Sequence, residues 1–150
     1  MWNSTLVIEP ETLRVNEAGS ATGNIWLDLN GKAFPADDWN DFIVVVTGWW
    51  VAALLRLVSG ERTRENVPFM DGPYSVEVTL DPSGILRFKA LRDIGDRKNE
   101  IASGDEPAED FILALISQSR ALLHACRVQG FSSKDVEALQ IRVDALKRRA

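Results

Sequence analysis

Residues 42–55 read FIVVVTGWWVAALL, the longest apolar run in the chain. Valines at 44–46 favour a buried strand, but the stretch 41–58 is too long for a typical strand, and residues 52–57 are strong helix formers. We therefore predict one long helix, apolar almost all round, around which the rest of a small domain folds. Gly48 costs about 1 kcal/mol inside a helix, so we expect it to permit close packing against a sheet.

The ends and the tryptophans of this helix lead to further expectations. Asp37 and Asp38 predict its start, because a carboxylate there accepts hydrogen bonds from free amides and complements the positive helix end. Trp49 and Trp50 differ by about 100° around a helix, so one should fill the core while the other reaches its edge. We expect the buried ring to lie in line with Val46, Ala53 and Leu57.

Period-two alternation predicts strands on both sides of the helix. Before it, aliphatic residues alternate within 6–15 and 25–29; Asn30-Gly31 suits the two positive φ angles of a type I′ turn, and Pro35 limits the returning strand. After it, residues 74–90 form the clearest hairpin, with DPSG in the preferred order for a type I turn. Its exposed face should carry ion pairs among Glu77, Arg87 and Lys89.

Two helices complete the predicted order. Residues 93–107 are polar and charged, and we expect a surface connection there. The second helix should begin at Asp105 or Glu106 and end before Gly130. The third opens with a variant capping box at residues 132–135, and its narrow apolar stripe consists of Val136, Leu139, Val143 and Leu146. A short loop makes the two an antiparallel pair.

The order strands, helix, hairpin, two helices predicts an α+β fold. We expect a mainly antiparallel sheet packed on the long apolar helix, with a C-terminal antiparallel helix pair. The chain of 150 residues has the length of one domain, and its 45% hydrophobic content supports a core. We predict a single domain over residues 1–150.

The net charge of −5 argues against nucleic acid or an anionic membrane as a main partner. Residues 1–110 carry 10 basic and 19 acidic side chains (−9), and residues 111–150 carry 7 and 3 (+4). Such an acidic body attracts a basic protein partner, although solubility alone explains the same charge. The N-terminus lacks a signal-peptide pattern, and the apolar run is shorter than the about 20 residues of a membrane span. We expect a soluble, cytoplasmic protein.

Candidate chemistry is sparse. Asp37, Asp38 and Asp41 suggest a cation site or an acid–base pair on one helical face, or simply a solubilised helix start. Divalent cations need more oxygen ligands than these, so we expect no metal and no cofactor. His124 and Cys126 lie about 200° apart on a helix; we expect an exposed histidine and a small buried hydrophobe. A single cysteine excludes an internal disulfide.

Several short motifs together resemble those of small bacterial immunity proteins. They are Asn30-Gly31-x-x-Phe34-Pro35, Trp39-x-Asp41-Phe42, Trp49-Trp50 and Phe69-Met70-Asp71-Gly72-Pro73-Tyr74. Proteins of that class neutralise a cognate polymorphic or contact-dependent toxin. They share no single fold or signature, so the resemblance implies binding to a toxin without locating a site. The last motif is also expected to form a turn flanked by core aromatics, or a pocket.

We therefore predict a non-enzymatic protein that occludes a basic toxin domain after electrostatic capture. The partner surface is expected on the acidic connection, at Asp93, Asp96, Glu100, Asp105 and Glu106. Two alternatives stay open. One is a small-molecule-binding or enzymatic domain that uses Asp37, Asp38 and Asp41. The other is a homo-oligomeric structural subunit whose interface is the apolar stripe of the last helix.

Overall fold

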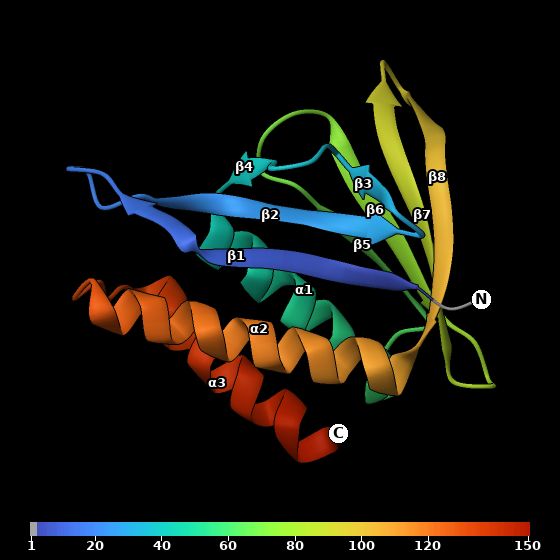
Figure 1. Ribbon diagram of the computed structural model, residues 1–150. Helices are drawn as coiled ribbons and strands as arrows, with labels where there is room; N and C mark the ends of the chain where they lie inside the picture. Colours follow the sequence, from blue (N-terminus) through green and yellow to red (C-terminus); the bar gives the residue numbers. More distant parts are fainter. Residues whose placement is uncertain (1–2) are drawn as a thin grey trace.

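The strands form two antiparallel sheets in the computed structural model, which describes residues 3–150 (Figure 1). Met1 and Trp2, in the segment where we expect no signal peptide, lie outside the described residues. In the first sheet β2 lies between β1 and β3 and also pairs with β4; the strands are β1 (Ser4–Val15), β2 (Ala21–Leu29), β3 (Lys32–Phe34) and β4 (Asn40–Asp41). Asn30 and Gly31 have φ angles of 55° and 89°, which confirms the type I′ turn.

The second sheet follows the order of the chain, with β5 (Arg64–Pro68), β6 (Tyr74–Leu80), β7 (Ile85–Ile94) and β8 (Arg97–Pro107). The turn between β6 and β7 is confirmed. The Gly84 N–H donates to the Asp81 carbonyl over 3.0 Å, and Asp81 Oδ1 accepts from the Ile85 N–H over 3.1 Å. This local hydrogen bonding closes the hairpin that the DPSG sequence predicts.

The charges on this hairpin pair differently from the prediction. Glu77 lies opposite Lys89, but its ion pair is with Arg64 of β5, at 4.0 Å. Arg87 instead forms ion pairs of 2.9 and 3.1 Å with Asp81 and Asp105. Because β8 flanks β7 on the other side, its carboxylates compete with those of β6. The sequence prediction had no strand at that position.

The expectation of an irregular connection at residues 93–107 is wrong. β7 continues to Ile94 and β8 begins at Arg97, so most of this segment is the outer part of a hairpin. Gly95, with a φ of 63°, lies in the turn between them. The sequence signal fails here because the outer hairpin is exposed on both faces. A strand in that position needs no apolar alternation.

The long apolar helix α1 (Ile43–Val58) is confirmed, but it starts later than predicted. Asp38 has a φ of 57°, in the left-handed region, and Asp41 belongs to β4, so the carboxylates precede the helix. No acidic side chain lies in the first turn, and Phe42 caps it without a side-chain hydrogen bond. Trp50 is fully buried whereas Trp49 is partly exposed, as predicted.

The C-terminal helices α2 (Ala108–Val128) and α3 (Lys134–Arg149) form the predicted antiparallel pair. A serine caps α3, as predicted, but it is Ser133, whose Oγ accepts from the Val136 N–H over 3.1 Å, one residue later than the capping box of residues 132–135 places it. The stripe of α3 is buried within the chain against α1 and α2, chiefly through Leu139, Val143 and Leu146. The surface expected to mediate self-association is therefore already covered. Gly48 faces α3 rather than a sheet, since a β-carbon there would lie 3.3 Å from Arg142 Nη1.

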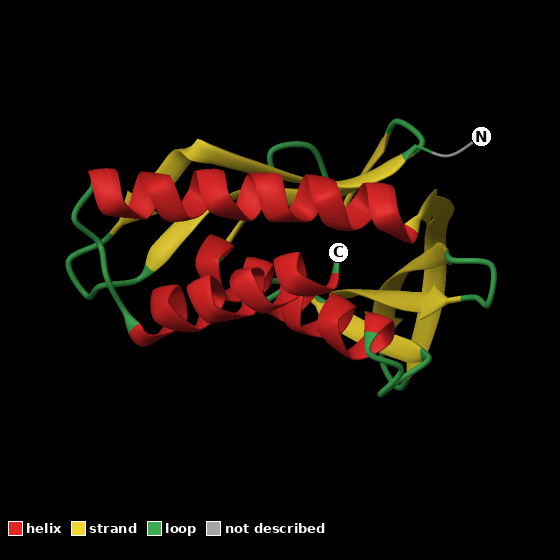
Figure 2. Ribbon diagram, turned by 90° about the horizontal axis from the view of Figure 1, so that it is seen from below, coloured by secondary structure: helices red, strands yellow, loops and turns green. Residues whose placement is uncertain are grey.

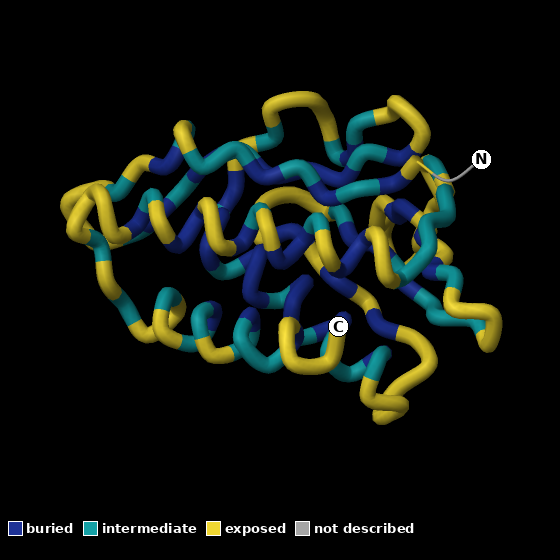
Figure 3. Tube along the Cα trace, turned by 60° about the horizontal axis from the view of Figure 1, so that its bottom comes forward, coloured by how far each residue is buried: buried dark blue, intermediate teal, exposed yellow. Residues whose placement is uncertain are grey.

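The core surrounds α1, which packs against β2, β5, α2 and α3. Seen from below in Figure 2, the helices lie in front of the first sheet, and the second sheet closes one end. The buried backbone runs through the middle of the molecule, and the exposed segments include the loops, the outer helix turns and the outer part of the β7–β8 hairpin (Figure 3). The two sheets meet at Gly104 of β8, where a β-carbon would lie only 2.5 Å from Ser4 Oγ.

Helix α2 is long and apolar enough, by length and composition, to cross a membrane. Its apolar face is nevertheless buried in the folded chain, through Phe111, Ile112, Leu115, Ile116, Leu122 and Leu123. It also lies along the free edge of β1, where Gln118 Oε1 accepts from the Ile8 N–H over 2.7 Å and Gln118 Nε2 donates to the Leu6 carbonyl. This side chain covers backbone groups that an edge strand otherwise leaves unpaired. The packing is consistent with a soluble protein.

Candidate protein-binding site

Two loops, residues 35–41 and 69–73, meet at the buried carboxylate of Asp41, which is only 2% exposed. Asp41 Oδ2 accepts from Trp39 Nε1 over 3.0 Å and from the Asp71 N–H over 3.2 Å. Its Oδ1 accepts from the Phe42 N–H over 2.7 Å. A buried carboxylate needs such donors to offset its lost hydration. Asp41 therefore ties together two loops that are 30 residues apart in the chain.

Four aromatic rings pack edge to face beneath these loops. Tyr74 lies 5.5 Å from Trp39 and 5.6 Å from Phe34 between ring centroids, and Phe69 lies 6.0 Å from Phe34. Phe34 and Phe69 are buried, whereas Trp39 and Tyr74 are partly exposed. Gly72 has a φ of 75°, and a β-carbon there would lie 3.0 Å from the Tyr74 ring, so only glycine fits this turn well. Packing thus fixes both partly exposed rings, and the hydrogen bond to Asp41 also holds Trp39.

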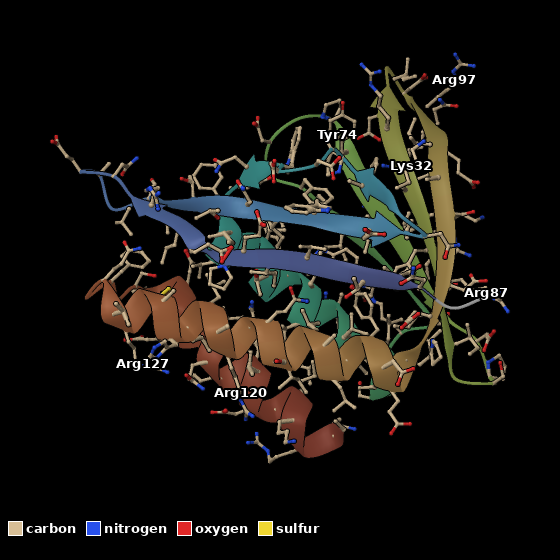
Figure 4. All side chains as sticks on the ribbon, in the orientation of Figure 1. Lys32, Tyr74, Arg87, Arg97, Arg120 and Arg127 are labelled. Carbon is tan, nitrogen blue, oxygen red and sulfur yellow. The ribbon has the colours of Figure 1, made fainter. Side chains whose placement is uncertain are left out.

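Exposed carboxylates and one thioether flank the two rings in the chain. Asp37, Asp38 and Asp71 are exposed, and Met70 is 49% exposed. Among the described residues, none of these three carboxylates forms an ion pair. We call Asp37, Asp38, Trp39, Met70, Asp71 and Tyr74 the acidic-aromatic patch. Figure 4 places Tyr74 on the opposite side of the molecule from Arg120 and Arg127 of α2.

The predicted cation or acid–base site at Asp37, Asp38 and Asp41 does not form on one helical face. All three residues precede α1, and the Asp41 carboxylate is buried and occupied by N–H donors. Over residues 3–150, no three His, Cys, Asp or Glu side chains gather in a way that suits a metal ion. The local chain conformation, with a positive φ at Asp38, overrides the helical spacing that sequence reasoning assumed.

The five carboxylates expected to bind the partner lie on the β7–β8 hairpin, but some of them are already engaged in contacts within the chain and others are not. Asp93 pairs with Lys98 at 2.8 Å, and Glu106 Oε1 accepts from the Ser4 N–H over 3.2 Å at the junction of the two sheets. Asp105 is held in the ion pair with Arg87 described above. Of these five carboxylates, Asp96 and Glu100 are exposed and form no ion pair with a described residue.

The outer hairpin adjoins the acidic-aromatic patch. The Asp93 N–H donates to the Pro73 carbonyl over 2.8 Å, directly beside the loop that carries Asp71. Residues 92–100 hold three basic and three acidic side chains, so this segment is neutral overall. The prediction of an acidic surface here used the net charge of residues 1–110, which does not show that basic side chains alternate with the acidic ones in this segment. The neighbouring loops 35–41 and 69–73 carry four carboxylates and no basic side chain, and residues 101–110 carry four more carboxylates.

Two predictions about α2 are confirmed. His124 is exposed and Cys126 is fully buried. Burial raises the pKa of the Cys126 thiol, while the charge of the adjacent Arg127 acts in the opposite direction. The buried thiol is therefore protonated at neutral pH and is a poor nucleophile.

Comparison with protein-family models, with curated proteins and with solved structures gives no match to this chain. We therefore infer the function from the geometry and charge of the patch. Sequence reasoning singled out both of its loops, the aspartates before α1 and the motif of residues 69–74. It missed their contact, because no local pattern reports a hydrogen bond across 30 residues.

Proposed function

We propose that this protein binds another protein through the acidic-aromatic patch and acts as an immunity-type inhibitor of a cognate toxin. The observation that carries the proposal is the juxtaposition of two fixed, partly exposed rings with three free carboxylates. Tryptophan, tyrosine and methionine are enriched at the centres of protein interfaces. A cytoplasmic location and a basic toxin domain as partner belong to the same proposal.

The patch supports capture in two stages. Asp37, Asp38 and Asp71 attract a basic surface at long range, which raises the rate of association. Lysine or arginine side chains of the partner then lie on the exposed faces of Trp39 and Tyr74, where a cation is attracted by the ring. Because both rings are already held in place, little side-chain entropy is lost on binding. The partner's active surface is covered without any reaction.

The outer hairpin extends this surface. Asp96 lies in the exposed turn of the hairpin and Glu100 on its exposed strand β8, and both serve as rim charges, which act mainly on the association rate. Asp93 takes part after release from Lys98, whereas Asp105 and Glu106 are engaged in ion pairing and sheet packing. We therefore rank Asp96 and Glu100 above the other three carboxylates of the expected set.

The decisive experiment pairs the protein with the product of the neighbouring gene. Co-expression followed by a pull-down should recover a complex, and the cell should be protected from that product. In binding kinetics, Asp37→Asn together with Asp71→Asn should slow association about tenfold at low salt. Glu11→Gln together with Glu17→Gln, which removes two exposed carboxylates from β1 and from the turn that follows it, is the matched control.

The outcomes separate two claims. If no complex forms and the cell gains no protection, the immunity proposal is wrong. If a complex forms and both double variants associate at the wild-type rate, only the choice of the acidic-aromatic patch is wrong. The same measurement with Asp96→Asn and Glu100→Gln tests the contribution of the hairpin.

A further inference from the structure

We infer that a cavity between α1, β5 and α3 binds a small organic carboxylate with a flat apolar body. The cavity has a volume of about 250 Å³ and shares no lining residue with the acidic-aromatic patch. One face of α1 supplies Trp49, Ala52 and Arg56, and the edge strand β5 and α3 supply Glu65, Pro68 and Arg142. The inference is independent of the proposed toxin inhibition.

The buried carboxylate in the cavity wall is already neutralised. Glu65 is 6% exposed, and it accepts from Arg56 Nε over 3.0 Å and from Arg56 Nη2 over 2.7 Å. Two parallel hydrogen bonds of this kind are the strongest pairing of an arginine with a carboxylate. The hydrogen bond to Glu65 raises the pKa of Arg56, so the guanidinium keeps its charge, and the ion pair of 2.7 Å with Glu65 compensates that charge.

Arg142 supplies an uncompensated positive charge. No carboxylate in the described part of the chain lies within ion-pair distance of its guanidinium. Its one hydrogen bond there is long, 3.4 Å from Nη1 to the Gly48 carbonyl. Most of its N–H donors are thus free, and the wall formed by Arg56, Glu65 and Arg142 carries a net charge of +1. A carboxylate in the cavity complements that charge.

Gly48 explains how this guanidinium reaches the cavity. A glycine inside a helix is destabilising relative to alanine, and Gly48 lies in the middle of α1. A β-carbon at that position would lie 3.3 Å from Arg142 Nη1, closer than side chains usually approach. The glycine therefore lets the guanidinium lie against the helix backbone. The close approach of Arg142 to α1 thus explains why a glycine occurs at this position of the helix.

The remaining wall and the size define the ligand. Trp49, Ala52, Val67 and Pro68 present apolar surface beside the charge of Arg142. Pockets for drug-sized ligands measure about 300–1,000 Å³, so this smaller cavity suits a molecule of about the size of benzoate. Arginine recognises a carboxylate with two parallel hydrogen bonds and also stacks on aromatic faces. A cation is disfavoured because two guanidinium groups line the wall.

Titration of the full chain with benzoate, followed by ¹⁵N-resolved NMR, tests the inference. The indole N–H signal of Trp49, assigned with Trp49→Phe, should shift in a saturable way. Arg142→Gln should weaken binding about tenfold or more, as loss of a hydrogen bond to a charged group does. Gly48→Ala, which displaces the guanidinium, should also weaken it, while Arg148→Gln on the same helix is the matched control. Neutral benzamide should bind at least about tenfold more weakly than benzoate.

Several results would overturn the inference. These are equal affinity for benzoate and benzamide, unchanged affinity of Arg142→Gln, shifts confined to signals away from the cavity, or no saturation at about 10 mM benzoate. Should Arg142→Gln fail to fold, Arg142→Lys keeps the charge without the planar fork and should still bind more weakly than wild type. If benzoate does not bind but association with a protein partner depends on Arg142, the cavity receives an acidic side chain instead, and the small-acid inference is wrong.

Discussion

Replacement of Asp41 by asparagine tests whether one buried carboxylate holds the acidic-aromatic patch together. The change keeps the shape of the side chain but turns one acceptor oxygen into an NH₂ donor. Oδ2 accepts from Trp39 Nε1 and from the Asp71 N–H, and Oδ1 accepts from the Phe42 N–H. Whichever way the amide turns, its NH₂ group faces at least one of these N–H donors.

The expected loss follows from these contacts. In the more favourable orientation of the amide, the hydrogen bond from the Phe42 N–H is lost and the two hydrogen bonds from Trp39 and Asp71 are kept. Loss of a buried hydrogen bond to a charged group costs about 1.5–3 kcal/mol. The two retained bonds weaken by about 1 kcal/mol in total, because charge-assisted bonds are roughly twice as strong as neutral ones. We expect the free energy of unfolding to fall by about 2.5–4 kcal/mol, a large share of the about 5–15 kcal/mol of a typical domain.

Urea unfolding followed by circular dichroism measures this loss, with Asp38→Asn as the control. Asp38 is exposed and has a φ of 57°, a conformation that asparagine tolerates, so the control should stay within about 0.5 kcal/mol of wild type. If Asp41→Asn lowers the free energy of unfolding by less than about 1 kcal/mol, the three hydrogen bonds do not hold the loops. The role given to Asp41 is then refuted.

Three further predictions concern the core, a turn and a thiol. Trp50→Ala should cost about 3–5 kcal/mol and Trp49→Ala clearly less, because only Trp50 is fully buried; equal losses in urea unfolding would contradict this. Gly72→Ala should cost about 1 kcal/mol or more, measured in the same way, since its φ is 75° and Tyr74 lies against it. Burial raises the pKa of Cys126, so its contribution to stability is present below the unfolded pKa of about 8.5 and is lost as pH rises above it. Wild type should therefore lose more stability than Cys126→Ala between pH 8 and 10.

The elements with a local signal were predictable. The alternation of β6, the DPSG turn, the glycine of the type I′ turn and the Ser133 cap each depend on neighbouring residues. The start of α1 was not predictable. The Asp41 carboxylate accepts a hydrogen bond from the Asp71 N–H of a distant loop and does not lie in the first turn of the helix. The outer β7–β8 hairpin was also missed, because its strands project past the core and are held by backbone hydrogen bonds, which any sequence can make.

The candidate sites show the same limit. Asp37, Asp38 and Asp71 were recognisable as acidic, and Trp39 and Tyr74 as aromatic. Their meeting depends on contacts between distant segments, which are the hydrogen bond from Asp71 to Asp41 and the packing of Trp39 on Phe69 and Tyr74. The role that we propose for Arg142 could not be predicted from the sequence, because its spatial neighbour Gly48 lies 94 residues away in the chain. Gly48 was the one sequence feature that indicated a close contact at this site. A glycine inside an apolar helix is unfavourable, so its presence suggests that packing requires it.

The net positive charge of the helices and the carboxylates of the acidic-aromatic patch lie on opposite sides of the molecule. Helices α2 and α3 contain almost all of the basic segment 111–150, of net charge +4, and lie on one side of the fold (Figures 1 and 2). Tyr74 and the loops of the acidic-aromatic patch lie on the other side (Figure 4). The basic partner that we propose would therefore be repelled by the helices and turned toward the patch before contact. Because such steering acts between exposed charges, its effect on the association rate should largely disappear once the Debye length falls to about 3 Å at 1 M salt, whereas the burial of Trp39 and Tyr74 should hold the complex together once it has formed.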